Sequence, residues 1–226
     1  MIYAFTFVLA FCSIVYELLL GQSLSAFLGN TVLRYSVTIG LYMLSMGLGS
    51  LLAEGRFVKH PVITLLRVEI ALTVTGGFSV IFLMLVNSAG LPDIVFSGCA
   101  HFLIILIGVL TGFEIPLLIE LRNLEVEGSE QKVLGVDYLG AFSGTVVFAF
   151  VFYPVVGLIP TAFVVALLNA LVGVLLMTQR QRVHEDRRRQ YGTLLGVQAG
   201  LFATLAVCSN FADRISDLFL RQYLGM

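Results

Sequence analysis

The sequence predicts an all-α integral membrane protein with seven transmembrane helices. Hydrophobic residues make up 58% of the chain and charged residues only 12%, which is more apolar surface than a water-soluble domain can bury. The mean hydropathy of +0.98 leaves no room for a second, aqueous domain among these 226 residues. Nearly all charged residues fall between the apolar blocks, which is the arrangement that a bilayer requires.

Seven apolar blocks are long enough to span a bilayer, for which a helix needs about 20 residues. No basic stretch precedes the first block and no small-residue cleavage pattern follows it, so we expect a retained span and not a signal peptide. The blocks cover residues 2–28, 33–55, 62–86, 93–121, 134–156, 160–178 and 192–210. Together they predict one transmembrane domain over residues 1–210.

Lysine and arginine residues are divided unequally between the two sides that alternating spans define. Ten of the thirteen fall on one side, including the run from Arg180 to Arg189, and three fall on the other side. The positive-inside rule then predicts a cytoplasmic N-terminus and an outside C-terminus in a bacterial cytoplasmic membrane. Because a short basic run beside an apolar span is an orientation signal, we expect the lipid bilayer as a partner and no nucleic acid.

The C-terminal residues 211–226 predict an amphipathic helix at the membrane interface. Their apolar and charged side chains alternate at helical spacing. The apolar members are Phe211, Ile215, Leu218 and Phe219, and the charged members are Asp213, Arg214, Asp217 and Arg221. A docking site for another protein is the alternative interpretation of this segment.

Glu17 and Glu114 lie deep inside apolar blocks, in the stretches YELLLGQ and GFEIPLL. A carboxylate at such a depth is costly unless it faces a cavity, a partner or the protein interior, so it is interpreted as functional by default. Ser13, Gly21 and Ser25 share the helix face of Glu17 at four-residue spacing. The alternative is that each glutamate is a buried hydrogen-bonding strut between helices.

Gly112 and Pro116 predict a kink beside Glu114. Pro116 cannot donate a hydrogen bond to the Gly112 carbonyl, and its ring disfavours a straight helix there. A bare carbonyl near a carboxylate would suit a cation, whereas a kink that serves only packing is the alternative. Gly108 and Gly112 also form a GxxxG step, which predicts a close helix neighbour.

Further polar residues complete the predicted substrate-binding set. Asp137 opens the fifth block and is expected to act either as a helix N-cap or as a ligand. Tyr16 and Tyr138 adjoin Glu17 and Asp137, and His101 is expected either to bond a backbone carbonyl or to lie on a water path towards Glu114. Glu69 is interpreted as a structural partner of Arg67 near the cytoplasmic boundary.

Cofactor and metal chemistry is not predicted by any motif. The three cysteines lie within or beside apolar blocks, which does not suit a disulfide framework or a zinc site. No phosphate-binding loop, dinucleotide fingerprint or nucleophile motif occurs in the sequence. Gln22, Asn169 and Gln198 are expected either to line a cavity or to bridge helices.

Glu17 and Glu114 are three spans apart and have similar surroundings. An aromatic residue precedes each one, Tyr16 or Phe113, and a tyrosine-containing, glycine-rich span follows each one. This pattern predicts a 3+3 inverted repeat followed by a seventh helix, an arrangement common in secondary transporters.

Four stretches resemble the membrane domain of the membrane-bound spermidine synthase-like proteins. They are VYELLLGQSLSAFLGN, YSVTIGLYMLSMGLGSLLA, GVLTGFEIPLL and GVDYLGAFSGTVVFAFVFYPVVGL, and the similarity covers residues 5–180. In that family the membrane part is often followed by a soluble aminopropyltransferase domain that binds decarboxylated S-adenosylmethionine. The resemblance therefore implies either a stand-alone membrane module or a piece of a longer enzyme.

These observations lead to an expected function. We expect a membrane module that binds or moves a small organic cation such as a polyamine, with Glu17, Glu114 and Asp137 as an acidic pocket. The alternative is a membrane scaffold that recruits a separately encoded aminopropyltransferase. A third alternative is an intramembrane enzyme that uses Glu17 or Glu114 as a general base. Catalysis by this chain alone is not expected, because the sequence has no catalytic or cofactor motif.

Overall fold

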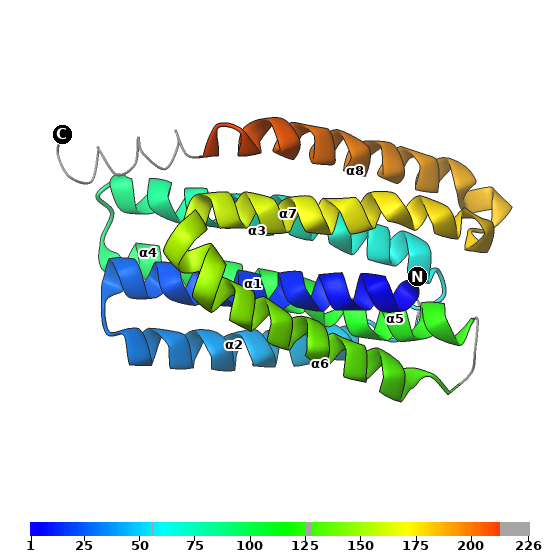
Figure 1. Ribbon diagram of the computed structural model, residues 1–226, viewed down its shortest axis with the longest axis horizontal. Helices are drawn as coiled ribbons and strands as arrows, with labels where there is room; N and C mark the ends of the chain where they lie inside the picture. The colour runs from blue at the N-terminus through cyan, green and yellow to red at the C-terminus, as the bar shows by residue number, and fades with distance from the viewer. Residues whose placement is uncertain (56, 125–127, 213–226) are drawn as a thin grey trace.

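A computed structural model describes residues 1–55, 57–124 and 128–212 of the chain, and all regular structure in this part is helical (Figure 1). Its α-helices are α1 (Ile2–Leu28), α2 (Thr31–Leu52), α3 (Pro61–Ser88), α4 (Asp93–Gly112), α5 (Glu114–Asn123), α6 (Glu130–Val147), α7 (Leu158–Leu175) and α8 (Arg188–Ser209). A π-helical segment, η1 (Phe148–Val156), continues α6. Two short 3₁₀ segments, η2 (Leu176–Arg182) and η3 (Glu185–Arg187), connect α7 to α8.

Seven helical stretches in this part of the chain are long and apolar enough to span a membrane. Two of them are composite, because α4 and α5 together form Asp93–Asn123 and α6 and η1 together form Glu130–Val156. The predicted number of long apolar helices is confirmed. The predicted amphipathic helix over residues 211–226 stays a prediction, because residues 213–226 lie outside the described residues.

The helix α1 lies at the centre of the bundle. It contacts α2, α3, α4, α5, α6 and α7, whereas α8 lies at one edge against α3 and α7 (Figure 1). Its long apolar residues face inward around most of the helix, and Val15, Leu19 and Leu20 have no exposed surface. A helix that is apolar on nearly all sides belongs inside a bundle, which explains its position.

Glycines let two pairs of helices approach backbone to backbone. A Cβ atom at Gly49 of α2 would collide with the Val109 carbonyl of α4, and one at Gly112 would collide with the Met46 carbonyl. In the second pair, a Cβ atom at Gly140 of α6 would collide with the Phe7 carbonyl of α1. The close neighbour expected at Gly108 and Gly112 is therefore α2, held by the van der Waals packing that small residues permit.

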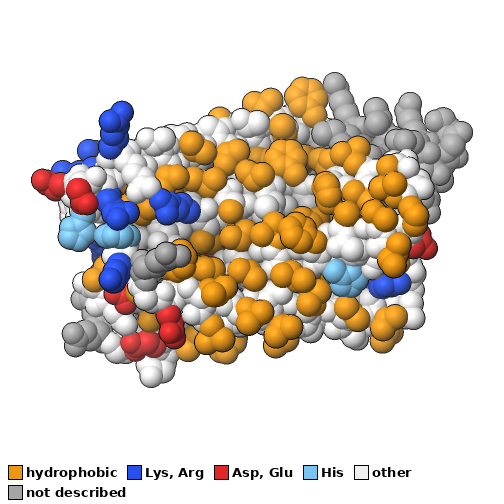
Figure 2. Space-filling model, turned by 180° about the vertical axis from the view of Figure 1, so that it is seen from behind, with side chains coloured by type: hydrophobic (Ala, Val, Ile, Leu, Met, Phe, Trp, Pro, Cys, Tyr) orange, Lys and Arg blue, Asp and Glu red, His pale blue; other side chains and the backbone are white. Residues whose placement is uncertain are grey.

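Charged side chains gather at one end of the bundle, and apolar side chains cover its middle (Figure 2). At the charged end, the loop between α2 and α3 lies beside the loop between α7 and α8. The rings of His60 and His184, one from each loop, pack edge to face with their centroids 6.0 Å apart. The uneven charge in the sequence thus corresponds to two polar ends and an apolar belt in the fold.

Two glycines of α2 offer a direct test of the close helix packing. We expect Gly49→Ala to destabilise the protein by about 1–3 kcal/mol, because the added methyl group meets the α4 backbone. Gly47→Ala is the matched control, since a Cβ atom at this position meets nothing within 4 Å. It should be neutral or stabilising by up to about 1 kcal/mol through helix propensity.

Thermal unfolding of both variants in detergent, followed by far-ultraviolet circular dichroism, measures the difference. Equal stability of the two variants would contradict the close approach of α2 and α4.

Candidate functional site

Glu114 begins α5 directly after a break in the fourth apolar stretch. The helix α4 ends at Gly112, and the Phe113 N–H turns back to the Leu110 carbonyl at 3.1 Å. The next helix starts with the Leu117 N–H bonded to the Phe113 carbonyl at 3.3 Å. Pro116 cannot donate a hydrogen bond to the Gly112 carbonyl, which accounts for the break. The Glu114 side chain lies inside the bundle and is only 4% exposed.

Two other carboxylates lie close enough to Glu114 for their charges to interact, namely Glu69 of α3 and Asp137 of α6. Glu69 is completely buried and Asp137 is half-buried. We call these three residues the acidic cluster. Within the described ranges, no three His, Cys, Asp or Glu side chains are arranged to hold a metal ion. Because α5 contacts both α3 and α6, the cluster consists of one carboxyl group from each of three neighbouring helices.

The structure corrects two interpretations of these carboxylates. Glu69 does not pair with Arg67, because residues two apart on a helix point to different sides. Arg67 is exposed, whereas Glu69 points inward and accepts a hydrogen bond from Asn169 Nδ2 at 2.9 Å. Asp137 does not cap a helix, since α6 begins at Glu130 and Asp137 lies almost two turns further along.

Glu17 is buried in α1 but stands apart from the acidic cluster. Its described link to Glu114 runs through Tyr42 of α2, whose side chain interacts with the charges of both glutamates. The Tyr42 hydroxyl donates to the Ser13 carbonyl at 3.1 Å and lies 3.1 Å from Ser13 Oγ. It also reaches the Thr111 side chain of α4. Tyr42 thus joins α1, α2 and α4 between the two glutamates.

Of the other predicted site residues, Tyr16 lies near Glu69 and Glu114, whereas Tyr138 and His101 lie elsewhere in the molecule. The Tyr16 ring packs against the Gly76 backbone of α3, and its buried hydroxyl has no hydrogen-bond partner in the described part of the chain. Tyr138 is 71% exposed and lies on the outer surface. His101 donates from Nδ1 to the Ser97 carbonyl at 2.6 Å, and thirteen helical residues separate it from Glu114 by ~20 Å. Tyr138 and His101 are therefore not brought to the acidic cluster.

Buried amides connect the outer helices to α3 and α1. Asn169 of α7 binds Glu69, and Gln198 of α8 donates to Thr73 Oγ1 of α3 at 3.2 Å. Gln22 of α1 accepts from the Tyr35 hydroxyl at 2.7 Å and donates to the Tyr153 hydroxyl at 2.8 Å. These amides were expected either to line a cavity or to bridge helices, and in the structure they bridge helices.

Sequence reasoning did not single out the tyrosines of α2. Tyr35 and Tyr42 bond to Gln22 and Ser13 of α1 respectively. The two tyrosines are seven residues apart and so lie on one face of α2. This seven-residue spacing could have identified the two tyrosines in the sequence as partners of the polar face of α1.

Comparison with known proteins relates the chain to enzymes. It is 33% identical over 215 residues to the polyamine aminopropyltransferase of Oceanobacillus iheyensis, with 92% of this chain and 42% of that protein covered. It is 38% identical over 177 residues to the polyamine aminopropyltransferase of Leptospira interrogans, covering 77% of this chain and 34% of the relative. It is also 34% identical to polyamine aminopropyltransferase 1 of Streptomyces coelicolor, over 96% of this chain and 41% of the relative.

No protein-family model and no solved structure matches the chain. The relationship to spermidine synthase-like proteins is thus supported by the curated relatives, and the chain spans 34% to 42% of their length.

These relatives overturn the expected function. The expectation of a module that only binds or moves a polyamine was wrong, because the relatives are named as transferases. The alternative of a scaffold for a separate partner is not better supported by these relatives. The physical cause of the error is that a buried carboxylate is equally compatible with a transport site, a structural bond and part of an enzyme.

Proposed function

We propose that this chain is the membrane part of an enzyme that transfers an aminopropyl group to a polyamine. The observation that carries the proposal is the similarity to named polyamine aminopropyltransferases over 92% and 96% of the chain in two relatives. A similarity of this extent includes all the long helices, so it does not arise from one generic apolar segment. The relatives' remaining length would supply the rest of such an enzyme.

The acidic cluster gives this part of the enzyme a chemical role. In aminopropyl transfer an amine nitrogen of the acceptor attacks the aminopropyl carbon, the bond from that carbon to the donor's sulfur breaks, and the nitrogen releases a proton. The acceptor is a polycation, which carboxylates in a low-dielectric setting attract strongly. We assign Glu114 and Asp137 to the acceptor's site, supported by their positions on the contacting helices α5 and α6 and by the partial exposure of Asp137.

The proposed enzyme is embedded in the bacterial cytoplasmic membrane with its N-terminus inside. The apolar belt and the basic loops at one end support this placement.

The packing also supports the inverted repeat. The first helix of each half packs on the second helix of the other, as α1 packs on α6 and α4 packs on α2, and the third helices α3 and α7 pack on each other.

An enzyme assay tests the proposed activity. Membranes from cells that express the full natural gene containing this chain should convert an isotopically labelled diamine into a product larger by one aminopropyl group. The reaction should require decarboxylated S-adenosylmethionine, and mass spectrometry identifies the product. Membranes from cells of the same strain without the gene are the control. Transfer no faster than in the control, despite inserted protein, would rule out the proposal.

The proposed orientation is tested by labelling single cysteines. The three native cysteines are first replaced by serine, and Gln181→Cys or Leu91→Cys is then introduced at an exposed site between two helices. A membrane-impermeant maleimide should label Leu91→Cys in intact cells, and Gln181→Cys only after the cells are opened. The reverse pattern would invert the orientation.

A further inference from the structure

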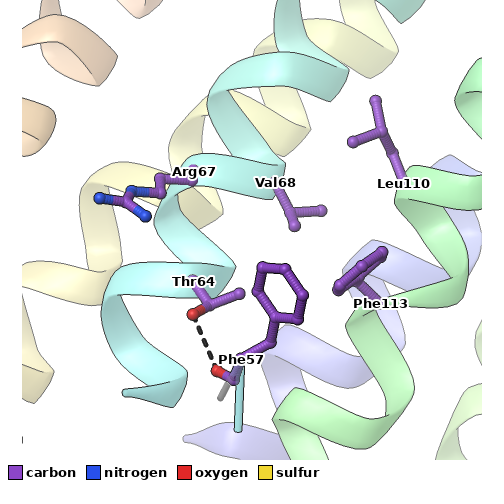
Figure 3. A pocket seen from close by; sticks show the side chains of 6 residues that line it. All are labelled: Phe57, Thr64, Arg67, Val68, Leu110 and Phe113. Carbon is purple, nitrogen blue, oxygen red and sulfur yellow. Dashed lines mark hydrogen bonds between the residues drawn. The ribbon is translucent and has the colours of Figure 1, made fainter. Parts of the chain in front are cut away.

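A pocket of about 180 Å³ lies where α3 faces the break between α4 and α5 (Figure 3). Five of its six lining residues are distributed over α3, α4 and that break, and one comes from the loop between α2 and α3. The six are Phe57, Thr64, Arg67, Val68, Leu110 and Phe113. The pocket belongs to the charged end of the bundle, because this loop and the start of α3 lie there.

The wall of the pocket is held in place by two contacts. Thr64 Oγ1 donates to the Phe57 carbonyl at 2.8 Å, which fixes the loop to the first turn of α3 (Figure 3). The Phe57 and Phe113 rings then meet edge to face, with their centroids 5.4 Å apart. The Thr64 hydroxyl proton is used in this bond, so the interior is lined mainly by apolar atoms. Such a lining suits an apolar group better than a water molecule, which needs two to four polar partners.

Arg67 adds a positive charge at the margin of the apolar pocket. It lies six residues after the start of α3, ~9 Å along the helix. Its side chain is exposed and has no ion pair or hydrogen bond within the described structure. Figure 3 shows its guanidinium group directed away from the two phenylalanine rings. The long stem of an exposed arginine near the end of a membrane helix can extend to the interface, where its charge can pair with an anion.

Basic residues outnumber acidic ones near this pocket, since residues 54–59 and 180–189 hold seven Lys and Arg and three Asp and Glu. Lys59 is exposed in the same loop, and the His60–His184 contact brings the basic segment 180–189 next to it. The acidic Glu185 of that segment is paired with Arg188 at 3.3 Å. An occupant that matches this region must therefore combine a negatively charged head with an apolar chain.

We propose that the pocket binds an anionic phospholipid, with part of one acyl chain against the Phe57 and Leu110 side chains and the phosphate on Arg67. The proposal rests on the membrane placement proposed above, because only there is the lipid at hand. Arg67 binds phosphate strongly through charge-assisted hydrogen bonds, and the aromatic walls accept the methylene groups.

Native mass spectrometry of the purified full-length protein in detergent tests this site. The probes are phosphatidylglycerol and phosphatidylcholine with the same acyl chains, and glycerol phosphate without acyl chains. Phosphatidylglycerol should bind about tenfold more tightly than phosphatidylcholine, since only the first has a net charge. Glycerol phosphate should not be retained. Equal retention of the two lipids, or retention of glycerol phosphate as strong as that of phosphatidylglycerol, would overturn the proposal.

Two matched pairs of variants locate the lipid. Arg67→Gln should weaken phosphatidylglycerol binding about tenfold, and Lys59→Gln, at an exposed residue of the same end outside the pocket, should change it little. Leu110→Phe should weaken binding by filling the pocket, whereas Ile105→Phe on the outer face of α4 should not. Circular dichroism melts confirm that all four variants fold. Unchanged binding in both Arg67→Gln and Leu110→Phe would place the lipid elsewhere and sink the proposal.

The experiments can refute the proposed lipid site and the proposed function independently of each other. A protein that transfers aminopropyl groups and has the predicted orientation but no preference for phosphatidylglycerol refutes only the lipid site. Failure of the transfer assay, with Arg67-dependent lipid binding intact, refutes only the proposed activity.

Discussion

A buried carboxylate with no cation beside it is the constraint on which the arrangement of this bundle depends. Glu69 has no exposed surface, and one of its oxygens accepts a hydrogen bond from Asn169 while the other has no partner within the described residues. Losing that single donor would leave a second oxygen of this buried side chain without a partner, which is costlier than losing a surface bond. The need to keep Asn169 against Glu69 therefore fixes α7 on α3, and α8 follows because Gln198 bonds to the same face of α3.

Close packing around α1 makes this interior possible. Side-chain burial alone gives little attraction between helices when lipid surrounds them, so small residues and hydrogen bonds must provide it. The small residues are glycines of α2, α4 and α6. The hydrogen bonds are those that Tyr42 and Gln22 make between helices. The same contacts hold Glu17 and Glu114 inside the bundle. The glycine-rich interfaces thus bring the helices close enough for the polar side chains of the interior to bond to one another.

The number and type of elements could be predicted from the sequence because apolar length is a local property. Seven long helices follow from it, as does the gathering of basic residues at one end. The neighbours of each carboxylate could not be predicted, because spacing gives a helix face and not the helix packed against it. Glu69 was therefore assigned to Arg67 and not to Asn169, a hundred residues further along the chain.

The proposed role of Glu114 and Asp137 in holding the polyamine acceptor can be measured by steady-state kinetics of the Glu114→Gln and Asp137→Asn variants, in membranes with equal amounts of folded protein. If these residues hold the polyamine, its KM should rise at least about tenfold while KM for the donor stays the same. Glu54→Gln, at an exposed glutamate, should leave both values unchanged. An unchanged polyamine KM in both cluster variants would contradict this role.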